Sequence, residues 1–131
     1  MAYGSIIAAL ETKLVNFAVA NSYDVSVPDI KYTPGTDPYL ESFILPAETG
    51  QGGLSATSYQ EYQGIYQVNV VTPKGNGTAD ERVIVDALLT EFSKASTAGS
   101  VQIQKSWASG SFEREGSWRV VPVSIRYRAY L

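Results

Sequence analysis

Two pairs of carboxylates are the residues of this chain whose type and spacing could support acid–base catalysis. Asp80 and Glu81 are adjacent, and Glu113 and Glu115 are separated by one residue. A hydrolase can divide acid and base roles between two such groups. The first pair follows Thr78 in the T-x-x-E pattern of a helix capping box, and the second is most simply a solvated loop. The sequence contains no histidine and no cysteine, which removes the commonest general base, thiolate chemistry and cysteine metal sites. We therefore predict no catalytic site, no metal and no enzymatic activity.

A segment with lysine and glycines, residues 74–78 (KGNGT), lies between a predicted strand and a predicted helix. A phosphate can bind at such a helix N-terminus. The phosphate-loop pattern G-x-x-x-x-G-K-[ST] is not met, because Lys74 precedes the glycines. The dinucleotide pattern is not met either, because Asp80 stands at its third glycine and would repel a pyrophosphate. We interpret the segment as a turn and a helix cap, and we predict no cofactor.

The basic side chains Lys105, Arg119, Arg126 and Arg128 are better candidates for a functional role. If residues 101–107 and 118–131 pair as strands, these four can gather on the exposed side of the sheet. Three interpretations stay open: an ordinary solvated strand face, a protein contact or ring lumen that tolerates passing DNA, and a nucleic-acid site. The net charge of −3 and the pI of about 4.9 disfavour the last, since nucleic-acid-binding domains are usually basic.

Charge is distributed unevenly along the chain. Residues 1–94 contain five basic and eleven acidic side chains, whereas residues 95–131 contain five basic and two acidic ones. An acidic part and a basic part on one molecule favour head-to-tail contact between copies.

Hydrophobic periodicity predicts two amphipathic helices. The first begins at Ser5 as its N-cap and runs to about Asn21; the second begins after Thr78. The apolar stripe expected on the first helix is Ile6, Leu10, Leu14 and Phe17, and that on the second is Ile84, Ala87, Leu88 and Phe92, extended by Val83.

Alternation of apolar and polar residues predicts the strands. Val101, Ile103 and Trp107 are expected to share one face of their strand. Pro122 cannot donate a backbone hydrogen bond, so the last strand is expected to be an edge strand or to be bulged there. The predicted strands are residues 39–45, 59–71, 101–107 and 118–131, with a possible edge strand at 23–27.

These elements predict an α+β fold in which two helices pack on one face of a four- to five-stranded, mostly antiparallel sheet. We expect a single domain, residues 1–131. Residues 1–17 have no basic run before the apolar part, and Glu11 and Lys13 interrupt that part. The sequence therefore predicts neither a signal peptide nor a membrane span. We expect a cytosolic origin.

One segment of the chain resembles a known family. Residues 64–70 (GIYQVNV), then Pro73, Gly75 and Gly77, then a helix ending at Phe92 resemble the small tailed-bacteriophage proteins of the tail terminator-like group. Those proteins show a G-x-Y-Q-V strand, a P-x-G-x-G turn and a helix that ends in phenylalanine. The early N-terminal helix and a closing strand rich in Val, Arg and Tyr are similar too.

The resemblance implies a virion structural protein, assembled in the host cytoplasm. Such proteins form a ring, commonly of six copies, at the head-proximal end of the tail tube, where they end tube polymerisation and provide the head-docking surface. The implied partners are other copies, the tail tube protein and a head-completion or connector protein, with DNA only as passing cargo and no membrane. Related folds also serve as neck or tail-completion proteins, and a nucleic-acid-binding module is a further alternative.

The resemblance also implies where contacts lie. The Gly/Ser/Thr-rich loop of residues 47–58 is either a flexible tip or a segment that orders on contact with a partner, and it is a candidate contact with the tube or a neighbour. The basic strand face is a candidate inter-subunit or lumen surface. The predicted interface residues are Gly50, Gln51, Gly52, Gly53, Leu54, Lys105, Arg119, Arg126 and Arg128.

Overall fold

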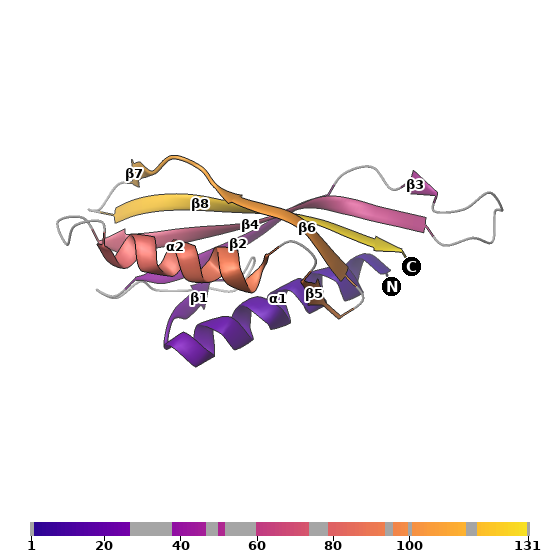
Figure 1. The fold of residues 1–131 in the computed structure, drawn as a ribbon, viewed down its shortest axis with the longest axis horizontal. Coiled ribbons are helices and arrows are strands. Elements are labelled where there is room, and N and C mark those ends of the chain that lie inside the picture. The colour runs from indigo at the N-terminus through magenta and orange to yellow at the C-terminus, as the bar shows by residue number, and fades with distance from the viewer. Residues whose placement is uncertain are drawn as a thin grey trace.

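The computed structural model describes residues 2–26, 38–46, 50–51, 60–73, 79–93, 96–99, 101–114 and 118–130. Within them the order is helix, four strands, helix, four strands (Figure 1). The elements are α1 (Ala2–Asn21), β1 (Asp24–Ser26), β2 (Tyr39–Pro46), β3 (Gly50–Gln51), β4 (Gln60–Pro73), α2 (Ala79–Glu91), β5 (Thr97–Ala98), β6 (Val101–Ala108), β7 (Phe112–Arg114) and β8 (Trp118–Tyr130).

The strands form one curled sheet, and the predicted number of four to five strands is wrong. The described residues form an eight-stranded sheet of order β1-β2-β4-β8-β6-β5, in which β3 also pairs with β4 and β7 with β8; the sheet curls into a half-barrel. The pairings are antiparallel except that β1 runs parallel to β2. The possible edge strand that the sequence predicts at residues 23–27 is β1. Strands β3, β5 and β7 contain only two or three residues, too few for alternation to reveal them in a sequence.

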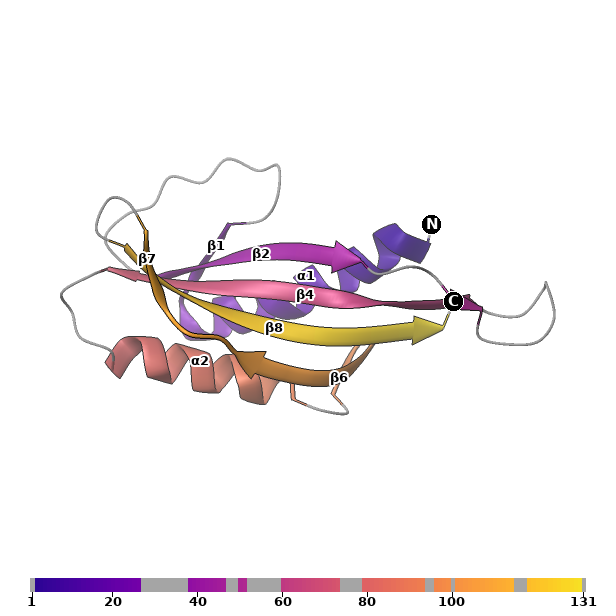
Figure 2. The same ribbon diagram turned by 90° about the horizontal axis from the view of Figure 1, so that it is seen from above.

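Both helices lie on the same side of the sheet, and the other face is open to view (Figures 1 and 2). The core fills the space between, because one set of alternating residues on each long strand points toward the helices. On β4 and β8 these are Tyr66, Val68, Val70, Val123, Ile125 and Tyr127, and the helices contribute Ile6, Leu10, Leu14, Ile84, Leu88 and Phe92. We call the helix-covered side the inner face and the opposite side the outer face.

The helices correct two predictions, the N-cap of α1 and the extent of the buried stripe of α2. Helix α1 begins at Ala2, so Ser5 lies inside it and is not its N-cap. The helix ends where Ser22 adopts the left-handed backbone conformation, with φ of 60°, and Asn21 Nδ2 donates to the Phe17 carbonyl at 2.9 Å. Val83 on α2 is 63% exposed, so the predicted extension of the buried stripe is wrong. The predicted cap Thr78 lies outside the described residues.

Pro122 interrupts pairing along one side of β8. This strand is central, between β4 and β6, so it is not an edge. Its partner changes from β6, whose last pair is Ala108 with Val123, to β7, whose first pair is Phe112 with Val120. The Pro122 carbonyl accepts from the Ser109 amide at 2.8 Å, but proline has no N–H to return a bond. The break between β6 and β7 follows from that missing donor.

Candidate interaction surface

Eight side chains on the outer face of β2, β4, β8 and β6 form two adjacent rows that run across the sheet. One row consists of Leu45, Ile65, Arg126 and Lys105, and the next consists of Phe43, Gln67, Ser124 and Trp107. We call these eight residues the outer block. Its β2 end is apolar and its β6 end is cationic and aromatic, with polar Gln67 and Ser124 in the middle.

A β-bulge brings Lys105 and Trp107 into the outer block. The register of β6 against β8 shifts between Ile103, which pairs with Tyr127, and Lys105, which pairs with Arg126. An extra residue in one strand reverses the faces of every residue that follows. Trp107 therefore lies on the outer face while Ile103 is buried, and the prediction that they share a face is wrong.

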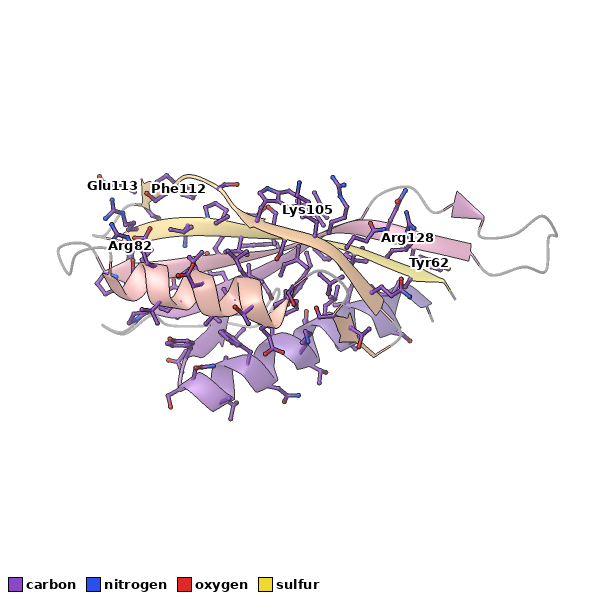
Figure 3. The ribbon with its side chains drawn as sticks, in the orientation of Figure 1. Tyr62, Arg82, Lys105, Phe112, Glu113 and Arg128 are labelled. Carbon is purple, nitrogen blue, oxygen red and sulfur yellow. The ribbon has the colours of Figure 1, made fainter. Side chains whose placement is uncertain are left out.

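Trp107 lies between two cations. Lys105 Nζ is 5.5 Å and Arg126 Cζ is 5.9 Å from the centroid of its ring, which is the range of cation–π attraction. Both cations are exposed, and neither has an ion pair among the described residues. Figure 3 shows Lys105 and Arg128 on the side of the sheet away from the helices. Because both cations lie against the Trp107 ring, two positive charges are close together, and this arrangement attracts an anionic group.

Arg128 borders a hollow beside this cluster. With the Gln104 amide oxygen turned toward the guanidinium, Arg128 Nε and Nη2 donate to it at 3.1 and 3.2 Å. The bulge therefore also supplies an acceptor that orients an arginine. The hollow, of about 380 Å³, is lined by Gln63, Gly64, Ile65, Gln104, Arg126 and Arg128.

Arg119 lies apart from the other three predicted basic residues. It is opposite Thr72 in the β4–β8 register, and its Nε is 3.5 Å from Glu81 Oε2 at the first turn of α2. Glu81 is only 8% exposed, so Arg119 balances a nearly buried carboxylate. The structure brings together Lys105, Arg126 and Arg128 without Arg119, whose part in an interface stays a prediction.

An ion pair that the sequence does not reveal links β7 to β2 at one end of the outer face. Arg114 of β7 donates to both carboxylate oxygens of Glu41 on β2, at 2.9 and 2.8 Å. Asn69 Nδ2 donates to Glu41 Oε1 at 3.4 Å, and Gln67 Nε2 donates to Asn69 Oδ1 at 2.9 Å. The hydrogen bonds to Glu41 raise the pKa of Arg114 above its ordinary value. Arg114 and Glu41 are 73 residues apart, so no local pattern indicates their contact.

The apolar end of the outer block is exposed to an unusual degree. Phe43 is 42% and Leu45 is 53% exposed, and Ile65 beside Leu45 is only partly buried. Adjacent exposed apolar side chains of this size mark an interaction site more often than scattered single ones do.

The predicted loop contact is only partly described. Gly50 and Gln51 form β3, which pairs with Glu61 and Gln60 of β4, so this part of the loop is strand. Figure 1 shows β3 near the N-terminal end of β4. Gly52, Gly53 and Leu54 lie outside the described residues, and a contact with the tube or a neighbour stays a prediction.

The described part of the chain offers no site for a metal ion and no membrane-spanning helix. Its acidic residues form no group of three or more that could hold a metal ion. Neither described helix combines the length and the hydropathy required to cross a bilayer.

Comparisons with known proteins match the chain along most of its length. The family model described as phage tail terminator protein matches residues 5–127, whereas no curated protein matches. One solved structure, which carries no functional description, is 24% identical, with a TM-score of 0.77 and coverage of 100% of this chain and 97% of the other. Another, from a virion of a native gene transfer agent particle, is 14% identical, with a TM-score of 0.60 and coverage of 95% and 93%.

The two solved structures, both under 25% identical, show that the fold is shared. The family match covers the G-x-Y-Q-V strand, the following turn and α2 together, and it confirms the resemblance. The chain belongs to the phage tail terminator protein family and is a structural component of the phage tail.

Proposed function

We propose that the protein closes into a ring, with six copies as the expected number, on the head-proximal end of the tail tube. There it ends tube polymerisation and presents the surface on which a head-completion or connector protein docks, with DNA only passing through. Membership of the tail terminator family supports this role, and the outer block is the observation that carries self-assembly. It exposes Phe43 and Leu45 at its β2 end and Lys105 and Arg126 toward its β6 end, and heterologous contacts between copies close into rings when their rotation allows it.

Tail-tube polymerisation in the presence and absence of the protein tests the proposal. Tubes that grow with the protein present should have a narrow length distribution in electron micrographs and carry a ring at one end. Light scattering after size exclusion should show a hexamer, or a monomer that assembles as concentration rises. A strict monomer that also fails to bind tail tubes would contradict the proposal.

Another neck or tail-completion role is distinguished by the partner that co-purifies. Trp107 between two cations is also an arrangement that single-stranded nucleic acid can use, by stacking and by phosphate contacts. That alternative predicts salt-sensitive DNA affinity that Arg126→Ala and Arg128→Ala abolish. The exposed Phe43 and Leu45 in the same rows favour a protein partner, because a phosphate backbone does not cover apolar side chains.

A further inference from the structure

Helix α1 has an outward side that is unusual for a surface helix. Its 20 residues include only two charged ones, Glu11 and Lys13, and Lys13 is paired with Glu91 of α2 at 3.1 Å. Val15 is 40% and Val19 is 73% exposed. Thr12 and Asn16 are also exposed on this side, so its polar groups are mostly uncharged, and Val15 and Val19, one helical turn apart, add adjacent exposed apolar side chains of the kind that mark an interaction surface.

This outward side has a hollow and a single negative charge. Ala8, Glu11, Thr12, Val15 and Asn16 line a hollow of about 330 Å³. Glu11 has no ion pair among the described residues. Its carboxylate therefore lies beside an apolar stripe with no cation of its own.

We propose that in the assembled protein the outward side of α1 of one copy packs on the outer block of a second copy, with Glu11 against Lys105 and Arg126, and Val15 and Val19 against Phe43 and Leu45. The inference rests on the proposed ring-forming function and names the surfaces that build it. Both surfaces combine exposed apolar side chains with unpaired charge, and the charges are opposite.

The spacing of charge and apolar groups agrees on the two surfaces. Along a helix, Val15 lies about 6 Å and Val19 about 12 Å beyond Glu11, at about 1.5 Å per residue. On the sheet, Leu45 and Arg126 lie in one row on strands separated by β4, which places them about 10 Å apart. A helix laid across the rows can therefore place its carboxylate at the cationic end and its valines at the apolar end.

A second copy fits the outer block better than a basic or neutral partner does. The chain carries a net charge of −3, so removing Lys105 and Arg126 from the sum leaves −5 for the rest of the molecule. Another copy thus brings the negative charge that this cluster attracts. The contact joins two different surfaces, so it is heterologous and each copy can bind two neighbours.

Disulfide cross-linking tests the contact cleanly because the chain contains no cysteine. In the presence of tail tubes, the double variant Val15→Cys/Phe43→Cys should form a ladder of cross-linked oligomers under oxidation. An equimolar mixture of the two single variants should stop at dimers, and neither single variant should cross-link alone. As a control, Val83→Cys, 63% exposed on α2, combined with Phe43→Cys should give no ladder.

Charge reversal tests the same contact without cysteines. Glu11→Arg alone, or Lys105→Glu with Arg126→Glu, should weaken association of copies at least about tenfold, since opposed like charges are costly. Combining the three changes should restore association, because the pairing is then reversed. Arg82→Glu, at an exposed site on α2 outside both surfaces, is the matched control and should leave association unchanged.

The outcomes separate this inference from the proposed function. Rings that form and cap tubes without a 15–43 cross-link, or with cross-links between identical positions, overturn the inference and leave the function standing. If the wild-type protein neither caps tubes nor associates with other copies under any condition, both the inference and the proposed function are overturned. Binding of DNA or tube protein to the outer block of isolated copies, with no effect of Glu11→Arg, also overturns the inference.

Discussion

At the scale of single residues, the outer face depends on where each charge finds a partner. Glu41 is held by Arg114, and Arg119 is held on the inner face by Glu81. Lys105 and Arg126 instead share Trp107 and keep their charge available. The β6 end of the outer block therefore keeps its positive charge, whereas the carboxylate of Glu41 on β2 is neutralised by Arg114 of β7.

The first prediction concerns the Glu41–Arg114 pair. Arg114→Ala should lower the free energy of unfolding by about 1–3 kcal/mol, because the Glu41 side chain is only 16% exposed and loses two charge-assisted hydrogen bonds. Chemical denaturation measures the change. Arg114→Lys should recover only part of it, since lysine cannot form the bidentate contact. Equal stability of wild type and Arg114→Ala would show that the pair is merely a surface contact.

The second prediction concerns Tyr66. Its hydroxyl and that of Ser42 are buried, and neither has a hydrogen bond of good geometry within the described residues, although the nearby Ser42 hydroxyl lowers the phenol pKa. Burial dominates and raises the pKa of Tyr66 above its ordinary 10.0. Because the unfolded chain ionises first, the stabilising contribution is complete below pH 10.0 and is lost as the pH rises above that value.

Tyr66→Phe is the corresponding variant. It should change the free energy of unfolding at neutral pH by less than about 1 kcal/mol, because the hydroxyl that it removes is unsatisfied. The loss of stability above pH 10.0 should become shallower than in wild type. Denaturation midpoints measured across that pH range check both expectations. A large loss at neutral pH would show that the hydroxyl has a partner.

At the scale of elements, the bulge in β6 decides the composition of the surface. Before the register shift, Val101 and Ile103 face the helices; after it, Lys105 and Trp107 face outward. Without the shift, Lys105 would continue the inner set and lie in the core. The bulge therefore matches the sequence to both faces, and it also places Gln104 beside Arg128.

The third prediction is that deleting Gln104 should lower the free energy of unfolding by less than about 1 kcal/mol. The deletion removes the extra residue of the bulge and leaves Lys105 opposite Arg126 and Trp107 opposite Ser124 on the outer face. Gln104→Ala keeps the extra residue and should also cost less than about 1 kcal/mol. Thermal unfolding compares the two variants, and a loss of several kcal/mol on deletion would contradict the assignment of Gln104 as the extra residue.

At the scale of the whole molecule, one layer of helices packed on one curled sheet leaves two surfaces exposed, the outward side of α1 and the outer block. The sheet buries one face against α1 and α2 and exposes the outer block on the other. At one end of the outer face Tyr39, Val71 and Val120 are buried beside Trp118. Over the outer block the domain has no third layer, and under the proposed function a neighbouring subunit covers it.

The fourth prediction is that Phe43→Ser with Leu45→Ser should abolish ring assembly and tube capping without unfolding the monomer. The two side chains are 42% and 53% exposed, so their loss removes little core packing, but it removes the apolar part of the contact. Circular dichroism monitors folding, and electron microscopy monitors tubes. Normal capping by this variant would exclude the apolar end of the outer block from assembly.

The sequence alone determined what local periodicity carries: two helices, the long strands β2, β4, β6 and β8, most of the apolar core and, through the run at residues 64–70, the family. The tertiary structure decided the rest. The short strands β3, β5 and β7 lack enough residues to show a pattern, and the bulge at Gln104 depends on the partner strand, as does the break opposite Pro122. The Glu41–Arg114 pair and the separation of Arg119 from Arg126 are set by pairings between distant segments, which no spacing along the chain encodes.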